Sequence, residues 1–116
     1  MTRNEKQPGG PTAEPTVHEA TLASGSSGGV YKGREIAFDA AVNRRKTGED
    51  VVVCGDDLGA NRRLARRIEE TVGPAVREPP HREAGPQALP HYQQEKRPPE
   101  GHTFYETENR KARKRR

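Results

Sequence analysis

Hydrophobic side chains recur at helical spacing in two segments of the chain. In residues 34–48 (REIAFDAAVNRRKTG), small apolar side chains follow one stripe, and Phe38 and Val42 form an i, i+4 pair beside it. Gly48 is typical of a helix C-terminus, because glycine readily adopts a positive φ there. In residues 55–74 (GDDLGANRRLARRIEETVGP), four apolar residues recur at every fourth position before a Gly-Pro stop. These four are Ala60, Leu64, Ile68 and Val72. The pattern predicts a helix in each segment.

Strand-like patterns lie between the two helices and after them. Residues 51–54 (VVVC) are apolar and mostly β-branched, which is typical of a strand buried on both faces. Residues 87–94 (QALPHYQQ) alternate weakly, and residues 102–106 (HTFYE) have the β-branched and aromatic content of a strand. Pro98, Pro99 and Gly101 place a turn between these two segments.

The first 29 residues show no hydrophobic period, and they end in SGSSGG, the composition of a flexible linker. We therefore predict a disordered linker over residues 1–29 and a small α+β domain over residues 30–107. This domain has two helices with a short buried strand between them, and one or two C-terminal strands. Residues 108–116 follow it as a basic tail.

The composition limits the size of any core. Hydrophobic residues make up 28% of the chain and charged residues 33%, with a mean hydropathy of -1.16. These values approach those of chains that cannot bury enough apolar surface to fold, so the core must be small and local. The single cysteine, Cys54, excludes an internal disulfide and is expected to be an inert thiol in the buried strand.

The sequence predicts neither a membrane span nor a signal peptide. No apolar run is long enough to span a membrane, and the N-terminus (MTRNEKQPGG) lacks the apolar region of a signal peptide. We expect a cytosolic site of action without membrane association, or export by a route that needs no signal peptide.

The net charge of +4 comes from the end of the chain. The last ten residues (TENRKARKRR) carry six Lys or Arg and one acid, whereas the first 106 residues carry 15 basic and 16 acidic groups. Such a tail attracts polyanions through counterion release, although a solubilising tail has the same composition. Four arginines also give the second predicted helix a basic side. The candidate nucleic-acid-binding residues are Arg62, Arg63, Arg66, Arg67, Lys96, Arg97, Arg110, Lys111, Arg113, Lys114, Arg115 and Arg116.

The strand, glycine turn and helix of VVVCGDDLGAN invite comparison with a phosphate-binding loop. The segment contains Gly55 and Gly59 but lacks the third glycine of a dinucleotide fingerprint and the Lys-Ser/Thr pair of a P-loop. Asp56 and Asp57 would repel a phosphate at the helix start. Ordinary helix capping by one of these aspartates is the favoured interpretation.

Three of the four histidines, His81, His91 and His102, lie close together in the sequence among Pro, Gly and Tyr residues. Their spacings of ten and eleven residues match no zinc motif. Histidines on strands or loops can still converge in space, with nearby acids completing a ligand set. These acids are Glu83, Glu95, Glu100 and Glu106. Because the spacing gives no specific support for a metal, we expect neither a metal ion nor another cofactor.

Metal-free phosphodiester cleavage suits these residue types better. It needs a base for the 2′-hydroxyl proton, an acid for the leaving oxygen, and cations near phosphorus. Histidine suits both proton-transfer roles, because its ordinary pKa lies close to operating pH. Arginine can hold a phosphate in bidentate fashion, and tyrosine can stack on a base or donate a hydrogen bond. The candidate catalytic residues are His91, His102, His81, Arg82 and Tyr105, the first two as the acid–base pair.

A structural role for the histidines competes with this interpretation. Successive strand residues point to opposite faces, so His102 shares a face with Phe104, and Thr103 shares the other with Tyr105. Phe104 has the character of a core residue. A histidine beside it is equally well explained as a buried side chain with satisfied hydrogen bonds.

The chain also resembles a known class of modules. Residues 48–70 (GEDVVVCGDDLGANRRLARRIEE), 80–93 (PHREAGPQALPHYQ) and 97–106 (RPPEGHTFYE) are similar to C-terminal toxin modules of bacterial polymorphic toxin systems, of the Rhs and contact-dependent inhibition types. The resemblance implies an effector domain that cleaves RNA or DNA and has an immunity protein as partner. It assigns no catalytic residue.

These observations lead to one main hypothesis and two alternatives. The main hypothesis is a toxin-like nuclease module that cleaves RNA rather than DNA by histidine acid–base chemistry. The first alternative is a non-catalytic protein that binds nucleic acid or an acidic partner through its Arg-rich helix and basic tail. The second is a structural or regulatory protein without a site.

Overall fold

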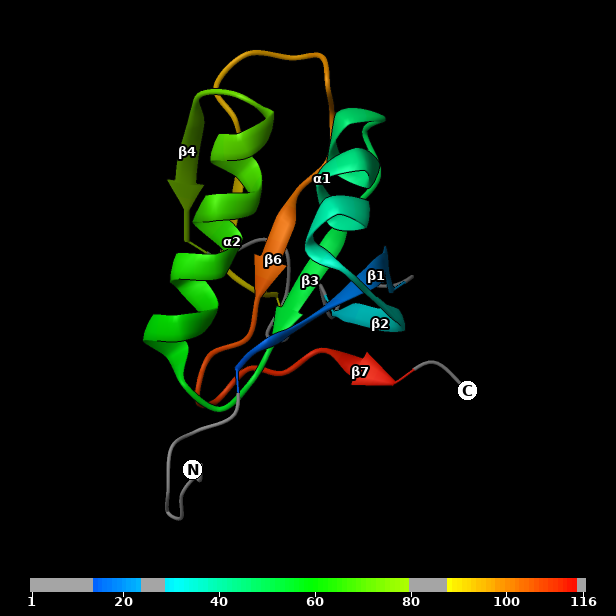
Figure 1. Ribbon diagram of the computed structural model, residues 1–116. Helices are drawn as coiled ribbons and strands as arrows, with labels where there is room; N and C mark the ends of the chain where they lie inside the picture. The colour runs from blue at the N-terminus through cyan, green and yellow to red at the C-terminus, as the bar shows by residue number, and fades with distance from the viewer. Residues whose placement is uncertain (1–13, 24–28, 80–87, 115–116) are drawn as a thin grey trace, which may run out of the picture.

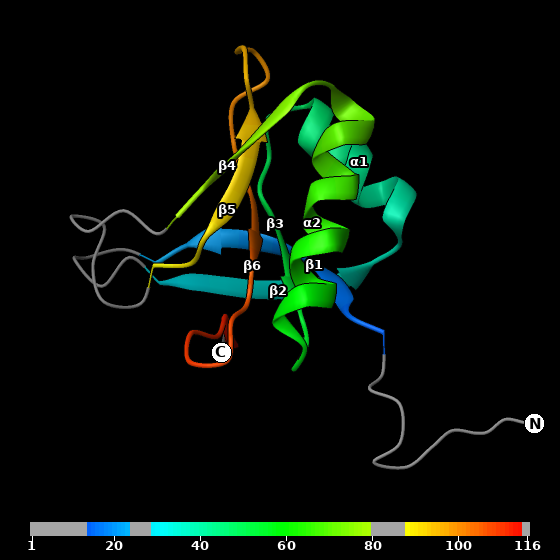
Figure 2. The same ribbon diagram turned by 90° about the vertical axis from the view of Figure 1, so that its left-hand side faces the viewer.

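The computed structural model describes residues 14–23, 29–79 and 88–114. Within these ranges, two helices cover one face of a seven-stranded mixed sheet (Figures 1 and 2). The elements are β1 (Thr16–Leu22), β2 (Val30–Ile36), α1 (Phe38–Lys46), β3 (Val51–Cys54), α2 (Leu58–Val72), β4 (Ala75–Glu78), β5 (His91–Gln94), β6 (Thr103–Tyr105) and β7 (Arg113–Lys114). The strand order is β4-β5-β6-β3-β1-β2-β7.

The predicted α+β class and its helix–strand–helix centre are confirmed. Gly48 follows the end of α1 with a φ of 87°, and Asp57 caps α2 by accepting a hydrogen bond from the backbone N–H of Ala60 at 3.2 Å. All four residues of β3 are buried, as their composition predicts. This strand lies at the middle of the sheet, antiparallel to β1 and parallel to β6.

The core has two parts, one on each face of the sheet. On the helix face, which we define as the face covered by α1 and α2, Val51 and Val53 pack with Ile68 and Tyr105. On the far face, Val52, Cys54 and Phe104 pack with Leu89 and Val30. Strand alternation explains the division, because neighbouring residues of β3 and β6 point to opposite faces.

The N-terminal boundary of the predicted domain is wrong. β1 lies within the segment predicted as a linker, yet it pairs with both β2 and β3. Only Val17 and Ala20 of this strand are buried hydrophobic residues, and a register shift between His18 and Ala20 breaks the alternation. The backbone hydrogen bonds of a sheet do not require an apolar side chain, so a polar segment can occupy a central strand. Residues 1–13 and 24–28 of the predicted linker lie outside the described ranges.

The predicted C-terminal boundary also changes. β7 lies inside the predicted basic tail and pairs in parallel with β2. The Arg110 guanidinium donates to the carbonyl oxygen of Ala88 at 2.7 Å, and the backbone N–H of Ala112 donates to Glu106 at 2.8 Å. The segment through Lys114 therefore belongs to the folded domain. The charges of this segment are visible in the sequence, whereas the partners of its backbone hydrogen bonds are not.

Candidate functional site

His91 and His102 meet on the far face of the sheet. Their ring centroids lie 4.6 Å apart, with an edge-to-face angle of 74°. Phe104 completes the cluster, with centroids 5.5 Å from His91 and 5.1 Å from His102. The register explains the contact, because His91 is opposite Phe104 and His102 precedes Phe104 by two positions on the same face. The pairing of β5 with β6 thus brings together two of the three predicted histidines.

A carboxylate holds His102 from the other side. Oδ1 of Asp50 accepts a hydrogen bond from the His102 backbone N–H at 2.8 Å and lies 3.3 Å from Nδ1 of the imidazole. The second contact is a hydrogen bond in the tautomer that carries a proton on Nδ1. Asp50 precedes β3 and His102 precedes β6, and these two strands run parallel. The parallel pairing therefore places both residues at the same end of the sheet.

The two imidazoles differ in exposure. The side chain of His102 is 30% exposed and that of Asp50 is 20% exposed, whereas His91 is only 4% exposed. Nε2 of His91 lies 3.1 Å from the side-chain oxygen of Gln93. His102 is thus the imidazole of this pair that reaches solvent, with His91 packed behind it. Such a cluster can transfer a proton at the surface while its geometry is fixed from within.

Tyr105 does not belong to this cluster. It is 3% exposed on the helix face, where its ring lies 5.9 Å from that of Tyr92. Burial, followed by the proximity of Tyr92, raises the pKa of the Tyr105 hydroxyl above its ordinary value. Its predicted supporting role beside the histidines is therefore wrong, because the sheet separates it from them. His81 and Arg82 lie outside the described ranges.

Asp50 is the site residue that the sequence hypothesis missed. The acids named as possible ligands in the sequence analysis are close in sequence to the histidines, whereas Asp50 is 52 residues from His102. Of those acids, Glu106 binds the backbone N–H of Gly55 at 3.1 Å, and Glu100 pairs with Arg97 at 3.6 Å. A carboxylate directly before a buried strand was the available signal. Only the pairing of β3 with β6 shows that this residue meets a histidine.

The arginines of α2 lie on the other side of the sheet from the histidine pair. All four are exposed: Arg62, Arg63, Arg66 and Arg67. Arg66 forms an ion pair with Glu70 at 2.9 Å, and the Arg67 guanidinium lies 4.5 Å from the centroid of the Phe38 ring. This basic surface therefore does not flank His91 and His102.

Other predicted basic residues lie nearer to the site in the chain. Lys96 and Arg97 are exposed on the segment between β5 and β6, which leads directly into His102. In the C-terminal segment, Lys111 lies 3.7 Å from the carboxylate of Asp56, and the Arg113 guanidinium lies 5.4 Å from the centroid of the Tyr31 ring. Lys114 is exposed, whereas Arg115 and Arg116 lie outside the described ranges.

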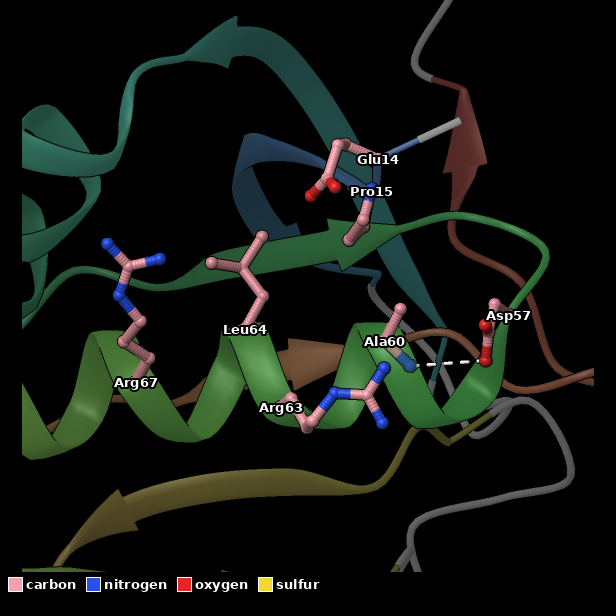
Figure 3. A pocket seen from close by; sticks show the side chains of 7 residues that line it. All are labelled: Glu14, Pro15, Asp57, Ala60, Arg63, Leu64 and Arg67. Carbon is pink, nitrogen blue, oxygen red and sulfur yellow. Dashed lines mark hydrogen bonds between the residues drawn. The ribbon is translucent and has the colours of Figure 1, made fainter. Parts of the chain in front are cut away.

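A groove of about 360 Å³ separates the start of β1 from α2 (Figure 3). Its lining includes Arg63 and Arg67, but also the carboxylates of Glu14 and Asp57. The two positive and two negative charges offset each other, so the groove has no clear preference for an anion. It also lies along α2, on the helix side of the sheet. We therefore do not assign it to the histidine site.

A buried ion pair lies beneath the site on the helix face. The side chains of Arg45 in α1 and Glu69 in α2 have no exposed surface, and Nε of Arg45 donates to Glu69. Glu69 also accepts a hydrogen bond from the Thr103 hydroxyl at 3.0 Å and another from the side-chain amide of Gln94. Composition and periodicity gave no indication of this network, because it joins four elements that are distant in sequence.

The described residues give no sign of a metal centre or a reactive thiol. Between residues 14 and 114, outside the gaps at 24–28 and 80–87, no three His, Cys, Asp or Glu side chains gather closely enough to bind a metal ion. Burial, reinforced by the charge of Glu106, raises the pKa of the Cys54 thiol to about 12. This thiol is therefore protonated at neutral pH. No helix in the described part of the chain has the length and apolarity needed to cross a membrane.

Comparison with protein-family models, with curated proteins and with solved structures finds no match to this chain. The function is therefore inferred from the site itself.

Proposed function

We propose that this protein is a toxin-like ribonuclease that cleaves RNA without a metal ion, with His102 and His91 as its acid–base pair. The observation that carries the proposal is the direct contact of a partly exposed imidazole with a carboxylate on one side and a second imidazole on the other. A base whose ring is oriented by a neighbouring side chain is a common arrangement in proton-transfer catalysis.

The reaction is a transesterification within the RNA strand. A histidine removes the 2′-hydroxyl proton, the resulting oxygen attacks phosphorus, and the bond from phosphorus to the 5′-oxygen breaks. A second group, acting as the acid, protonates that oxygen. The products are a 2′,3′-cyclic phosphate and a 5′-hydroxyl end. Because one proton is taken and one is given, the enzyme needs no further co-reactant.

The geometry suggests different roles for the residues. His102 is exposed enough to exchange a proton with substrate, and Asp50 fixes the orientation of its ring. His91 contacts His102 edge-on and is the second proton-transfer group, a role that requires its 4% exposed ring to become accessible when RNA binds. Lys96 and Arg97 lie on the segment before His102 and supply positive charge for the phosphate. Arg82 keeps its predicted phosphate role, and His81 stays the third histidine candidate.

The first test is RNA cleavage in excess EDTA by the purified protein and its histidine variants. We expect His102→Ala and His91→Ala each to lower the rate by about 10²–10⁴-fold, the usual contribution of a positioned acid or base. Asp50→Asn keeps an acceptor for the His102 backbone N–H but removes the charge, so we expect a smaller loss in the same direction.

The fourth histidine provides a matched control. His18 lies on β1, where its ring contacts the Thr16 hydroxyl at 3.0 Å and the carbonyl oxygen of Gly33 at 3.1 Å. His18→Ala should therefore retain the cleavage rate. Unchanged cleavage by a folded His91→Ala/His102→Ala double variant would falsify the assignment.

A toxin function also implies a second protein that binds this chain. A nuclease of this kind needs an inhibitor in the cell that makes it, so we propose an immunity protein that binds this chain and blocks cleavage. Expression of wild-type protein alone should then arrest growth, whereas the His91→Ala/His102→Ala variant should not.

A second candidate function is non-catalytic binding of nucleic acid or an acidic partner. The observation that favours it is the exposed row of four arginines along α2. In this case, His91 is a core residue, which its 4% exposure also permits. One result distinguishes the two functions. A binding protein forms a complex with RNA and leaves the RNA intact, whereas a ribonuclease cleaves it.

A further inference from the structure

The buried guanidinium of Arg45 touches the backbone on both sides of the candidate site. Nη1 donates to the carbonyl oxygen of Glu49 at 3.1 Å and to that of Glu100 at 2.8 Å. Glu49 immediately precedes Asp50, and Glu100 lies two residues before His102. One side chain therefore links the two segments that carry the carboxylate and the imidazole.

Glu69 fixes the other end of this guanidinium. Its carboxylate accepts from Nε of Arg45 and from the hydroxyl of Thr103, the residue directly after His102. The side chain of Thr103 points to the helix face and that of His102 to the far face, since they are neighbours on an extended strand. The ion pair thus contacts the segment on both sides of His102, through the carbonyl oxygen of Glu100 and the hydroxyl of Thr103.

Close packing around Gly101 shows how tightly these segments meet. Gly101 has a φ of 94°, and a Cβ atom there would lie 2.7 Å from Nη1 of Arg45 and 2.8 Å from the carbonyl oxygen of Gly48. Both distances are below normal van der Waals contact. Glycine therefore lets the segment before His102 reach the buried guanidinium.

Stability alone is a poor explanation for this ion pair. Burying two charges has a large desolvation cost, and apolar side chains of similar size commonly give equal or greater stability. A positional role explains why charged groups occupy this place, because a guanidinium offers several donors in a fixed planar arrangement. Lysine carries the same charge but lacks that arrangement.

We propose that Arg45, held by Glu69, is a positioning residue that keeps Asp50 in contact with His102. The proposal rests on the ribonuclease function for its catalytic consequence. Its structural part concerns the Asp50–His102 contact and can be measured in the absence of any activity.

The experiment compares Arg45→Lys with wild type by amide hydrogen exchange and by cleavage kinetics. The His102 backbone N–H donates to Asp50, whereas the Glu106 N–H donates to Val53 within the same part of the sheet at 3.0 Å. We expect exchange at His102 to become at least about tenfold faster while exchange at Glu106 changes by less than about twofold, because local opening requires less free energy than global unfolding. Equal acceleration at both amides means that Arg45 serves only stability and overturns the proposal.

The kinetic arm tests whether the effect passes through His102. Arg45→Lys should lower kcat about tenfold or more and leave KM within about twofold, as expected when an interaction is lost in the transition state. In a His102→Ala background, the same substitution should have no further effect on cleavage. A full additional loss in that background would show that Arg45 acts elsewhere.

Two further variants complete the design. Arg34→Lys makes the same chemical change at an exposed residue paired with Glu19, and it should match wild type in both measurements. Thr103→Val removes one hydrogen bond to Glu69 with little change in shape, so it tests the proposal if Arg45→Lys does not fold. It should accelerate exchange at His102 selectively, and unchanged exchange there counts against the proposal. If wild-type protein cleaves no RNA, the proposed function fails while the exchange arm still decides the positioning role.

Discussion

At the scale of single residues, identical side chains acquire different roles from their backbone positions. Asp56 and Asp57 are adjacent, and either satisfies the sequence rule for a helix cap. In the structure, only Asp57 accepts a hydrogen bond from the first turn of α2, whereas the side chain of Asp56 is 98% exposed and lies near Lys111. The sequence therefore identified the start of the helix and left its cap undecided between two residues.

This difference gives a prediction with its own control. Asp57→Ala should lower the free energy of unfolding by about 1 kcal/mol, the usual contribution of a capping side chain. Asp56→Ala should change it by less than about 0.5 kcal/mol, because an exposed ion pair contributes little. Urea denaturation of both variants measures the two values. Equal losses would mean that the cap is shared.

At the scale of secondary-structure elements, the helices and β3 are visible in the sequence, but β1 is not. The two helices carry their own periodic signals, and β3 is a continuous apolar run. β1 has few apolar residues and owes its position to hydrogen bonds with β2 and β3. One partner, β3, is distant in sequence, and the register shift between His18 and Ala20 breaks the alternation that would mark β1 as a strand. Local patterns therefore do not predict β1.

The central place of β1 leads to a truncation experiment. Deletion of residues 1–13 leaves every described strand in place, so we expect a cooperative thermal transition to remain. Deletion of residues 1–22 removes β1, separates β2 and β7 from β3, and takes Val17 and Ala20 from the two core clusters. We expect that variant to show no cooperative transition by circular dichroism. Equal transitions in the two truncations would contradict the place of β1 in the sheet.

At the scale of the whole molecule, the sheet separates two surfaces of different character. The far face carries the contact between His91 and His102, and the helix side carries the arginines of α2. A nucleic acid that occupies one surface does not automatically touch the other. The separation makes the two candidate functions independently testable.

Salt dependence distinguishes the contribution of the α2 surface. Neutralising two arginines, as in Arg62→Gln/Arg63→Gln, should reduce the slope of log affinity against log salt by about 1.4 for single-stranded RNA, at roughly 0.7 for each phosphate contact. Arg34→Gln/Lys46→Gln removes the same charge from exposed positions outside the candidate surface and should leave the slope nearly unchanged. Titrations of labelled RNA at several salt concentrations give these slopes. Similar slopes for the two double variants would exclude α2 as the binding surface.

The sequence by itself determined the α+β class, both helices, the buried central strand and the face that His102 shares with Phe104. These features depend on local propensity and on the periods of helix and strand, and consecutive residues determine both. Tertiary structure decided the rest: the place of β1 and β7 in the sheet, the contact of His91 with His102, and the separation of Tyr105 from both. It also decided the contacts of Asp50, Arg45 and Glu69. Their partners lie dozens of residues away, and only strand pairing and helix packing bring such residues together.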